Sequence, residues 1–87
     1  MIRWDKGGDA SVGALDADRV TLVSSTPSAP GSRIDGALGS GSRLRVKVHG
    51  CRRRDDGRFV LEGRLLDASR ALRAELAALV PPLEGAG

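Results

Sequence analysis

Aromatic residues are almost absent from this chain. Its 87 residues include one tryptophan, Trp4, and one phenylalanine, Phe59, and no tyrosine. Leucine, valine, isoleucine and alanine must therefore fill the core of what can be at most one small domain. The scarcity also counts against a site for single-stranded nucleic acid, because such sites stack bases on aromatic rings.

Cysteine and histidine each occur once, as Cys51 and His49. No intrachain disulfide can form, and a zinc site built from Cys and His is excluded because it needs four ligands. We expect Cys51 to be a small apolar filler or a bystander. With one histidine and no paired catalytic residues in the sequence, we expect no enzyme, no metal and no cofactor.

Long apolar runs are also missing. No stretch approaches the ~20 residues of a membrane-spanning helix, and no signal peptide is visible, so we expect a cytoplasmic protein without a membrane span. The net charge of +3 is too small by itself to imply nucleic acid as a partner.

Alternation of apolar and polar residues predicts four strands, at residues 20–24, 32–38, 43–50 and 59–66. Residues 1–13 show no clear period, so we expect an N-terminal segment there, in which residues 1–4 could form a short strand anchored by Trp4. The domain proper is expected at residues 14–80, and residues 81–87 as a frayed tail. Short antiparallel strands in this number favour a closed barrel, because closure removes exposed edges.

The strand at residues 43–50 has one strongly basic face. Leu44, Val46 and Val48 point one way, and the opposite face carries Arg43, Arg45, Lys47 and His49. On the return strand, Arg64 and also Arg58 could extend this face. Such a row suits phosphates, an acidic protein surface or nucleic acid. The alternative is a solvated face that discourages edge pairing, with Glu62 as a cross-strand partner.

The period changes after Leu66. Residues 67–80 place four apolar side chains at helical spacing on one side: Leu72, Leu76, Leu79 and Val80. Asp67 or Ser69 can cap the start of this helix, and Pro81 and Pro82 cannot continue it. We expect the apolar stripe to pack on the barrel; a groove or a homodimer contact is the alternative.

The order of these pieces resembles the PilZ family. In that family a strand leads into a proline-bearing loop that ends in Pro-Gly, and a second strand, a long hairpin and a C-terminal helix follow. The corresponding parts here are residues 20–22, 27–31, 32–38, 43–66 and 67–80, with Leu66 where the family usually has Phe. The resemblance implies a mainly-β fold, a small six-stranded antiparallel barrel with one C-terminal helix.

PilZ domains are receptors for cyclic di-GMP, which they hold with an Arg-x-x-x-Arg segment and an Asp/Asn-x-Ser-x-x-Gly segment. This chain departs from both. An ungapped alignment puts Ala14, Asp16 and Arg19 in the Asp, Ser and Gly places, and a second alignment fits Asp9 and Ser11 but needs an insertion. The positions left to contact a nucleotide are Asp16, Arg19, Arg3 and Lys6.

Three functions therefore stay open. The first is a PilZ-like signalling adaptor that works through protein contacts in a cyclic di-GMP-linked bacterial pathway such as motility, with Arg43, Arg45, Lys47, His49 and Arg64 as partner-binding residues. The second is a receptor that binds cyclic di-GMP through non-standard Arg and Lys contacts. The third is a small basic barrel that binds nucleic acid.

Overall fold

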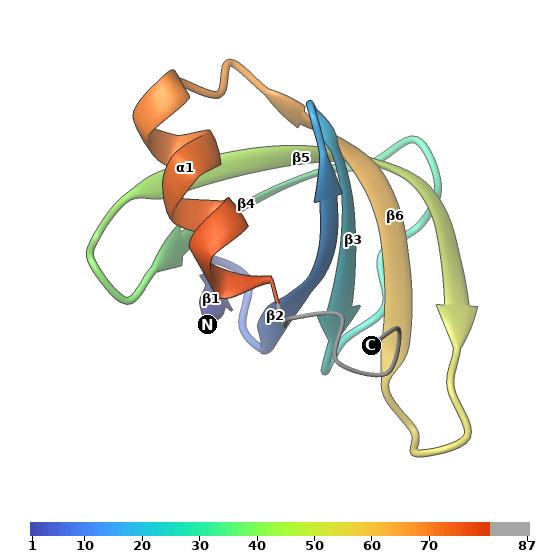
Figure 1. Ribbon diagram of the computed structural model, residues 1–87. Helices are drawn as coiled ribbons and strands as arrows, with labels where there is room; N and C mark the ends of the chain where they lie inside the picture. Colours follow the sequence, from blue (N-terminus) through green and yellow to red (C-terminus); the bar gives the residue numbers. More distant parts are fainter. Residues whose placement is uncertain (81–87) are drawn as a thin grey trace, which may run out of the picture.

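The computed structural model describes residues 1–80 as a closed barrel followed by one helix (Figure 1). The strands are β1 (Ile2–Trp4), β2 (Asp9–Asp16), β3 (Arg19–Ser24), β4 (Arg33–Leu38), β5 (Arg43–Arg53) and β6 (Phe59–Leu66), and the helix is α1 (Arg70–Leu79). Neighbouring strands pair antiparallel in the order β1-β2-β3-β6-β5-β4, and β4 returns to β1. The predicted fold class is confirmed. The expected tail at residues 81–87 lies outside the described residues.

The inward face of the wall is the one that the alternation predicted. The predicted inward residues of β5, Leu44, Val46 and Val48, are buried. The alternate apolar residues of β4 and β6 are buried as well, with Phe59 half-buried at the start of β6. The fully buried large side chains of the barrel are Ile2, Leu22, Val46, Val48 and Leu61. Aliphatic residues from all six strands thus make one core, as a chain with two aromatic residues requires.

The N-terminal residues belong to the barrel. The short strand expected at residues 1–4 is present as β1, and Trp4 is 6% exposed. The absence of regular structure expected up to residue 13 is corrected, because β2 begins at Asp9 and buries Ala10 and Val12. A bulge after Val12 interrupts the alternation, and the small residues of β2 give it little apolar signal.

The β5–β6 hairpin is longer than the sequence pattern predicted. β5 continues to Arg53, three residues past the predicted end at residue 50, and Asp56 and Gly57 lie in the turn that follows. A bulge between Val48 and Gly50 shifts the register against β6, so the alternation changes phase there. The run of three arginines at residues 52–54 therefore begins on a strand, with Arg52 and Arg53 in β5.

Helix α1 starts after Ser69, which is one of the two caps that the sequence predicted. The Ser69 hydroxyl accepts a hydrogen bond from the Leu72 backbone N–H at 3.0 Å. Leu72 and Leu76 are buried in the barrel core, whereas Leu79 is 41% exposed, so its place in the apolar stripe is corrected. Val80 follows the helix in an extended conformation and packs against the core instead.

A carboxylate fastens α1 to the turn between β4 and β5. Glu75 accepts a hydrogen bond from the Ser42 hydroxyl at 2.8 Å and a second one from the Ser40 hydroxyl. These hydrogen bonds lower the pKa of Glu75. Within residues 1–80, no helix combines the length and the apolar character needed to cross a membrane.

Replacing Leu76 with alanine should open a cavity where the side chain is fully buried. We expect Leu76→Ala to lower the free energy of unfolding by roughly 2 to 4 kcal/mol, and the matched control Leu79→Ala to have little effect because Leu79 is exposed. Urea denaturation followed by circular dichroism measures both. A near-neutral Leu76→Ala would show that α1 does not pack on the core.

Gly63 lets β6 approach β5 closely. A Cβ atom there would lie 2.5 Å from the Lys47 backbone oxygen and 2.8 Å from a Val46 methyl carbon. We expect Gly63→Ala to destabilise the protein by roughly 1 to 3 kcal/mol. The control is Gly50→Ala on the same hairpin, where a Cβ meets nothing within 4 Å. Equal unfolding midpoints for the two variants would contradict this account of the hairpin.

Candidate anion-binding surface

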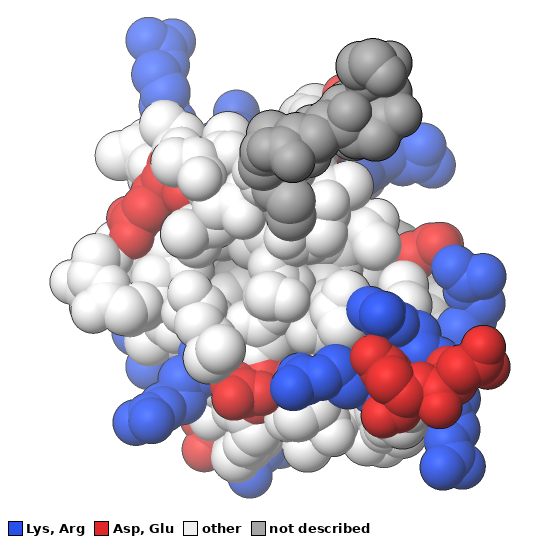
Figure 2. Space-filling model, turned by 60° about the horizontal axis from the view of Figure 1, so that its bottom comes forward, with Lys and Arg blue, Asp and Glu red and all other residues white. Residues whose placement is uncertain are grey.

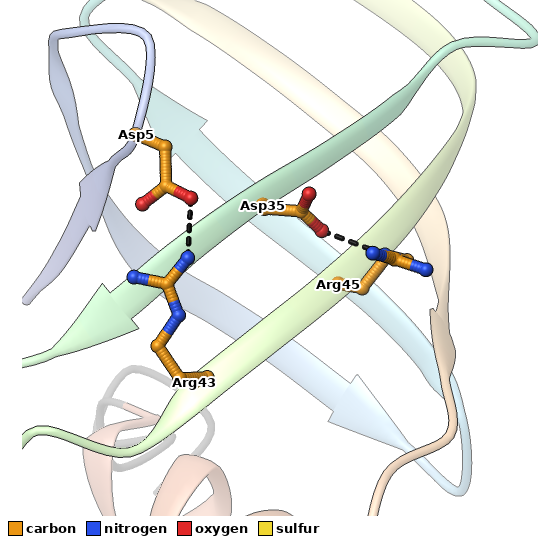
Figure 3. Close-up of polar contacts among 4 residues, drawn as sticks. All are labelled: Asp5, Asp35, Arg43 and Arg45. Carbon is orange, nitrogen blue, oxygen red and sulfur yellow. Dashed lines mark hydrogen bonds and ion pairs between the residues drawn. The ribbon is translucent and has the colours of Figure 1, made fainter.

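The predicted basic face of β5 is present, but half of it is neutralised. Arg43, Arg45 and His49 are exposed and Lys47 is half-buried. Arg43 pairs with Asp5, which follows β1, and the Arg45 Nε lies 2.7 Å from an oxygen of Asp35 on β4 (Figure 3). These two arginines therefore already hold counter-ions.

The pKa values of these groups follow from the pairing. The hydrogen bond from Arg45 lowers the pKa of Asp35, and the charges of Arg45, Arg43 and Lys6 act in the same direction. In return, Asp35 raises the pKa of Arg45, and Asp5 raises the pKa of Arg43. The Arg45–Asp35 pair thus favours the charged forms of both partners, and the contact with Asp5 favours the charged form of Arg43.

Four other cations line up across the barrel wall. The strand register sets Arg19 on β3 opposite Arg64 on β6, Arg64 opposite Lys47 on β5, and Lys47 opposite Arg33 on β4. We call these four residues the cationic row. Among the described residues, none of the four forms an ion pair.

The geometry of the cationic row is electrostatically unfavourable. Neighbouring strands lie about 4.8 Å apart, so the row spans about 14 Å. Like charges directly opposite each other on paired strands destabilise a sheet. Here that arrangement occurs in three consecutive pairs. A bound anion would relieve this repulsion.

Carboxylates bound the row on several sides. Asp35 lies two residues beyond Arg33 on β4, Glu62 lies two residues before Arg64 on β6, and Asp16 lies opposite Arg19 across the β2–β3 hairpin. Asp35 and Glu62 are held by other arginines, with 2.7 Å to Arg45 and 3.9 Å to Arg52. The positive surface is therefore short and confined, which suits a small number of anionic groups better than a long polyanion.

His49 joins the β3 end of the row. It lines a hollow of about 470 Å³ together with Arg19, Arg64, Asp16 and Asp18. Asp18 also forms an ion pair with Arg73 of the helix, at 3.0 Å. The hollow thus combines two cations of the row with one imidazole.

The predicted nucleotide contacts are not brought together. Asp16 and Arg19 share the hollow beside His49, Lys6 lines a different hollow beside Trp4, and Arg3 lines a third on β1. Of the predicted partner-binding residues, Lys47, His49 and Arg64 lie in or beside the row. Arg33 is the member that sequence reasoning missed. Its outward direction was readable from alternation, but its position opposite Lys47 depends on the register.

The described surface gives less evidence for an apolar binding site than for a charged one. Figure 2 shows a face with Lys and Arg at the margin, interspersed with Asp and Glu, around an uncharged centre. Among residues 1–80, the exposed large apolar side chains are Met1 and Leu79. Neither forms the large contiguous apolar patch that usually marks a hydrophobic interface.

Comparisons with family models, with curated proteins and with solved structures found no match to this chain. The resemblance to PilZ domains therefore stays a prediction. Within the described residues, no group of three His, Cys, Asp or Glu side chains is arranged to hold a metal ion.

Removing a charge from the middle of the row should stabilise the fold. Arg64 faces a cation on both sides, so we expect Arg64→Gln to raise the free energy of unfolding by a few tenths to about 1 kcal/mol at low salt. The gain should shrink as salt screens the repulsion. The control is Arg53→Gln, whose partner across the hairpin is Phe59. Lower stability of Arg64→Gln in a denaturant titration would contradict the repulsion.

Proposed function

We propose that this protein is a non-catalytic adaptor module that docks an acidic surface of a partner protein onto the cationic row. The observation that carries the proposal is the alignment of four cations in consecutive cross-strand pairs without an ion-pair partner among residues 1–80. The resemblance to PilZ domains adds the setting, a cytoplasmic bacterial pathway linked to cyclic di-GMP, such as motility.

An acidic protein surface suits the row because a folded partner can hold a few carboxylates at fixed positions over the same short length. Carboxylates of a folded partner can match Arg19, Arg64, Lys47 and Arg33 over about 14 Å, and complementary charge speeds and orients association. Nucleic acid suits the row less well, because the cations beside it, Arg45 and Arg52, are paired with Asp35 and Glu62 and do not extend the positive charge along a phosphate backbone. Stacking platforms are also scarce, since Trp4 is buried and Phe59 half-buried.

A second candidate is cyclic di-GMP itself, and one observation favours it. Arg19, Arg64 and His49 line the same hollow, and guanidinium groups bind phosphates and guanine edges in a bidentate manner. Asp16 and Asp18 in that hollow oppose an anion, and Arg19 stands where the family has Gly. We therefore expect weak binding of this nucleotide.

The experiment compares two double variants that remove the same charge. The row variant, Lys47→Gln with Arg64→Gln, removes the two central positive charges of the row. The hairpin variant, Arg53→Gln with Arg58→Gln, removes two cations that form no ion pair among the described residues. A partner captured by the parent protein is purified and titrated against each form by calorimetry. We expect the row variant to lose more than tenfold in affinity and the hairpin variant to change little.

The salt dependence and two competing ligands complete the test. The loss should shrink at high salt, because exposed charges are screened within about 8 to 10 Å. Cyclic di-GMP and random DNA are titrated separately against the parent. A dissociation constant for cyclic di-GMP in the low-micromolar range or tighter would favour the receptor function over the adaptor function. Unchanged partner affinity in the row variant would leave the row as a solvated face.

A further inference from the structure

A second hollow lies beside the sole tryptophan, and it differs in character from the surface around the row. Its volume is about 220 Å³, and it lies between the turn after β1 and the loop that joins β3 to β4. Trp4, Pro27 and Ile34 supply apolar walls. The volume falls below the roughly 300 to 1,000 Å³ of pockets for drug-sized ligands, so it suits a single ring or a short chain.

The charges around this hollow leave a positive excess. Asp5 and Asp35 line it, and Figure 3 shows both carboxylates directed at arginines of β5. Lys6 and Arg33 also line it, and neither forms an ion pair among residues 1–80. With both acids satisfied from outside, the two cations stay available to an anion.

The walls of the hollow are held in place before any ligand arrives. The Trp4 indole N–H donates to the Ser24 hydroxyl at 3.0 Å, and that hydroxyl donates to the Thr26 carbonyl at 2.7 Å. Ser24 is fully buried. Gly8 packs so closely on Thr26 that a Cβ atom would lie 2.7 Å from its methyl carbon. A rigid site loses less entropy on binding.

We propose that this hollow is a binding site for a small organic anion, a carboxylate on an apolar ring or short chain. The apolar body would lie against Trp4, Pro27 and Ile34, and the carboxylate would face Lys6 and Arg33. Arg33 also belongs to the cationic row, whereas Lys6 does not. The proposal does not depend on the adaptor function, and Lys6 and Lys47 separate the two sites experimentally.

The sole tryptophan makes the site directly observable. The chain contains no tyrosine, so its intrinsic fluorescence reports Trp4. Benzoate and hexanoate are the anionic probes, benzamide is the neutral match of benzoate, and benzylamine is the cationic match. Each is titrated against the full chain while tryptophan emission and the amide NMR signals of Gly7 and Thr26 are followed. We expect at least one anion to bind with a dissociation constant of about 1 mM or tighter.

Variants locate the charge that matters. We expect Lys6→Gln to weaken binding of that anion at least fivefold, while Arg3→Gln on β1 and Lys47→Gln in the row leave it unchanged. Benzamide should bind at least fivefold more weakly than benzoate, and benzylamine should not compete. Failure of both anions to shift these signals, or equal affinity for benzoate and benzamide, would overturn the proposal. Lys6→Gln should still bind the protein partner of the row, so the two proposals can fail separately.

Discussion

The seating of β1 against β4 is the contact on which the rest of the structure depends. β1 has three residues, and by pairing with both β2 and β4 it closes the barrel. Gly36 makes this possible, because a Cβ there would lie 2.8 Å from both the Arg3 carbonyl oxygen and the Trp4 ring. Trp4 then reaches Ser24 on β3 with its indole N–H. One glycine and one tryptophan thus join three strands that are distant in the sequence.

The strand order of the barrel fixes both candidate sites. Because β3 and β4 are not neighbours in the barrel, the loop between them must travel from one to the other, and this brings Thr26 and Pro27 beside Trp4. The same strand order sets β3, β6, β5 and β4 side by side, so one outward residue from each forms the cationic row. A different strand order would therefore remove both arrangements.

The sequence predicted elements better than it predicted their partners. The hairpin strand at residues 59–66, the inward leucines and valines of β5 and the Ser69 cap all follow from local pattern, and the structure has them. β2 was not predicted, because its bulge after Val12 breaks the alternation on which strand prediction rests. Leu79 was misplaced because periodicity does not show that α1 ends there and leaves Val80 to make the last core contact.

The candidate site was harder to predict than the strands, because it depends on contacts between strands. Alternation along β5 gave four basic residues in a line, but Arg43 and Arg45 are paired with acids from β4 and from the turn after β1. Such neighbours across strands are set by register, which the pattern within one strand does not contain. The cationic row runs across the strands and includes Arg19 and Arg33, which are 14 residues apart in the sequence.

The carboxylates near the cationic row are paired with other cations. Asp35 and Glu62 lie next to it, yet their ion pairs are with Arg45 and Arg52. The carboxylates thus neutralise the cations around the row and leave its own members without ion-pair partners among residues 1–80. A surface that only needed to stay solvated would gain stability from alternating the signs across the strands. This pattern instead confines the positive charge to a narrow band, as expected if the row binds a matching anionic surface in the way proposed above.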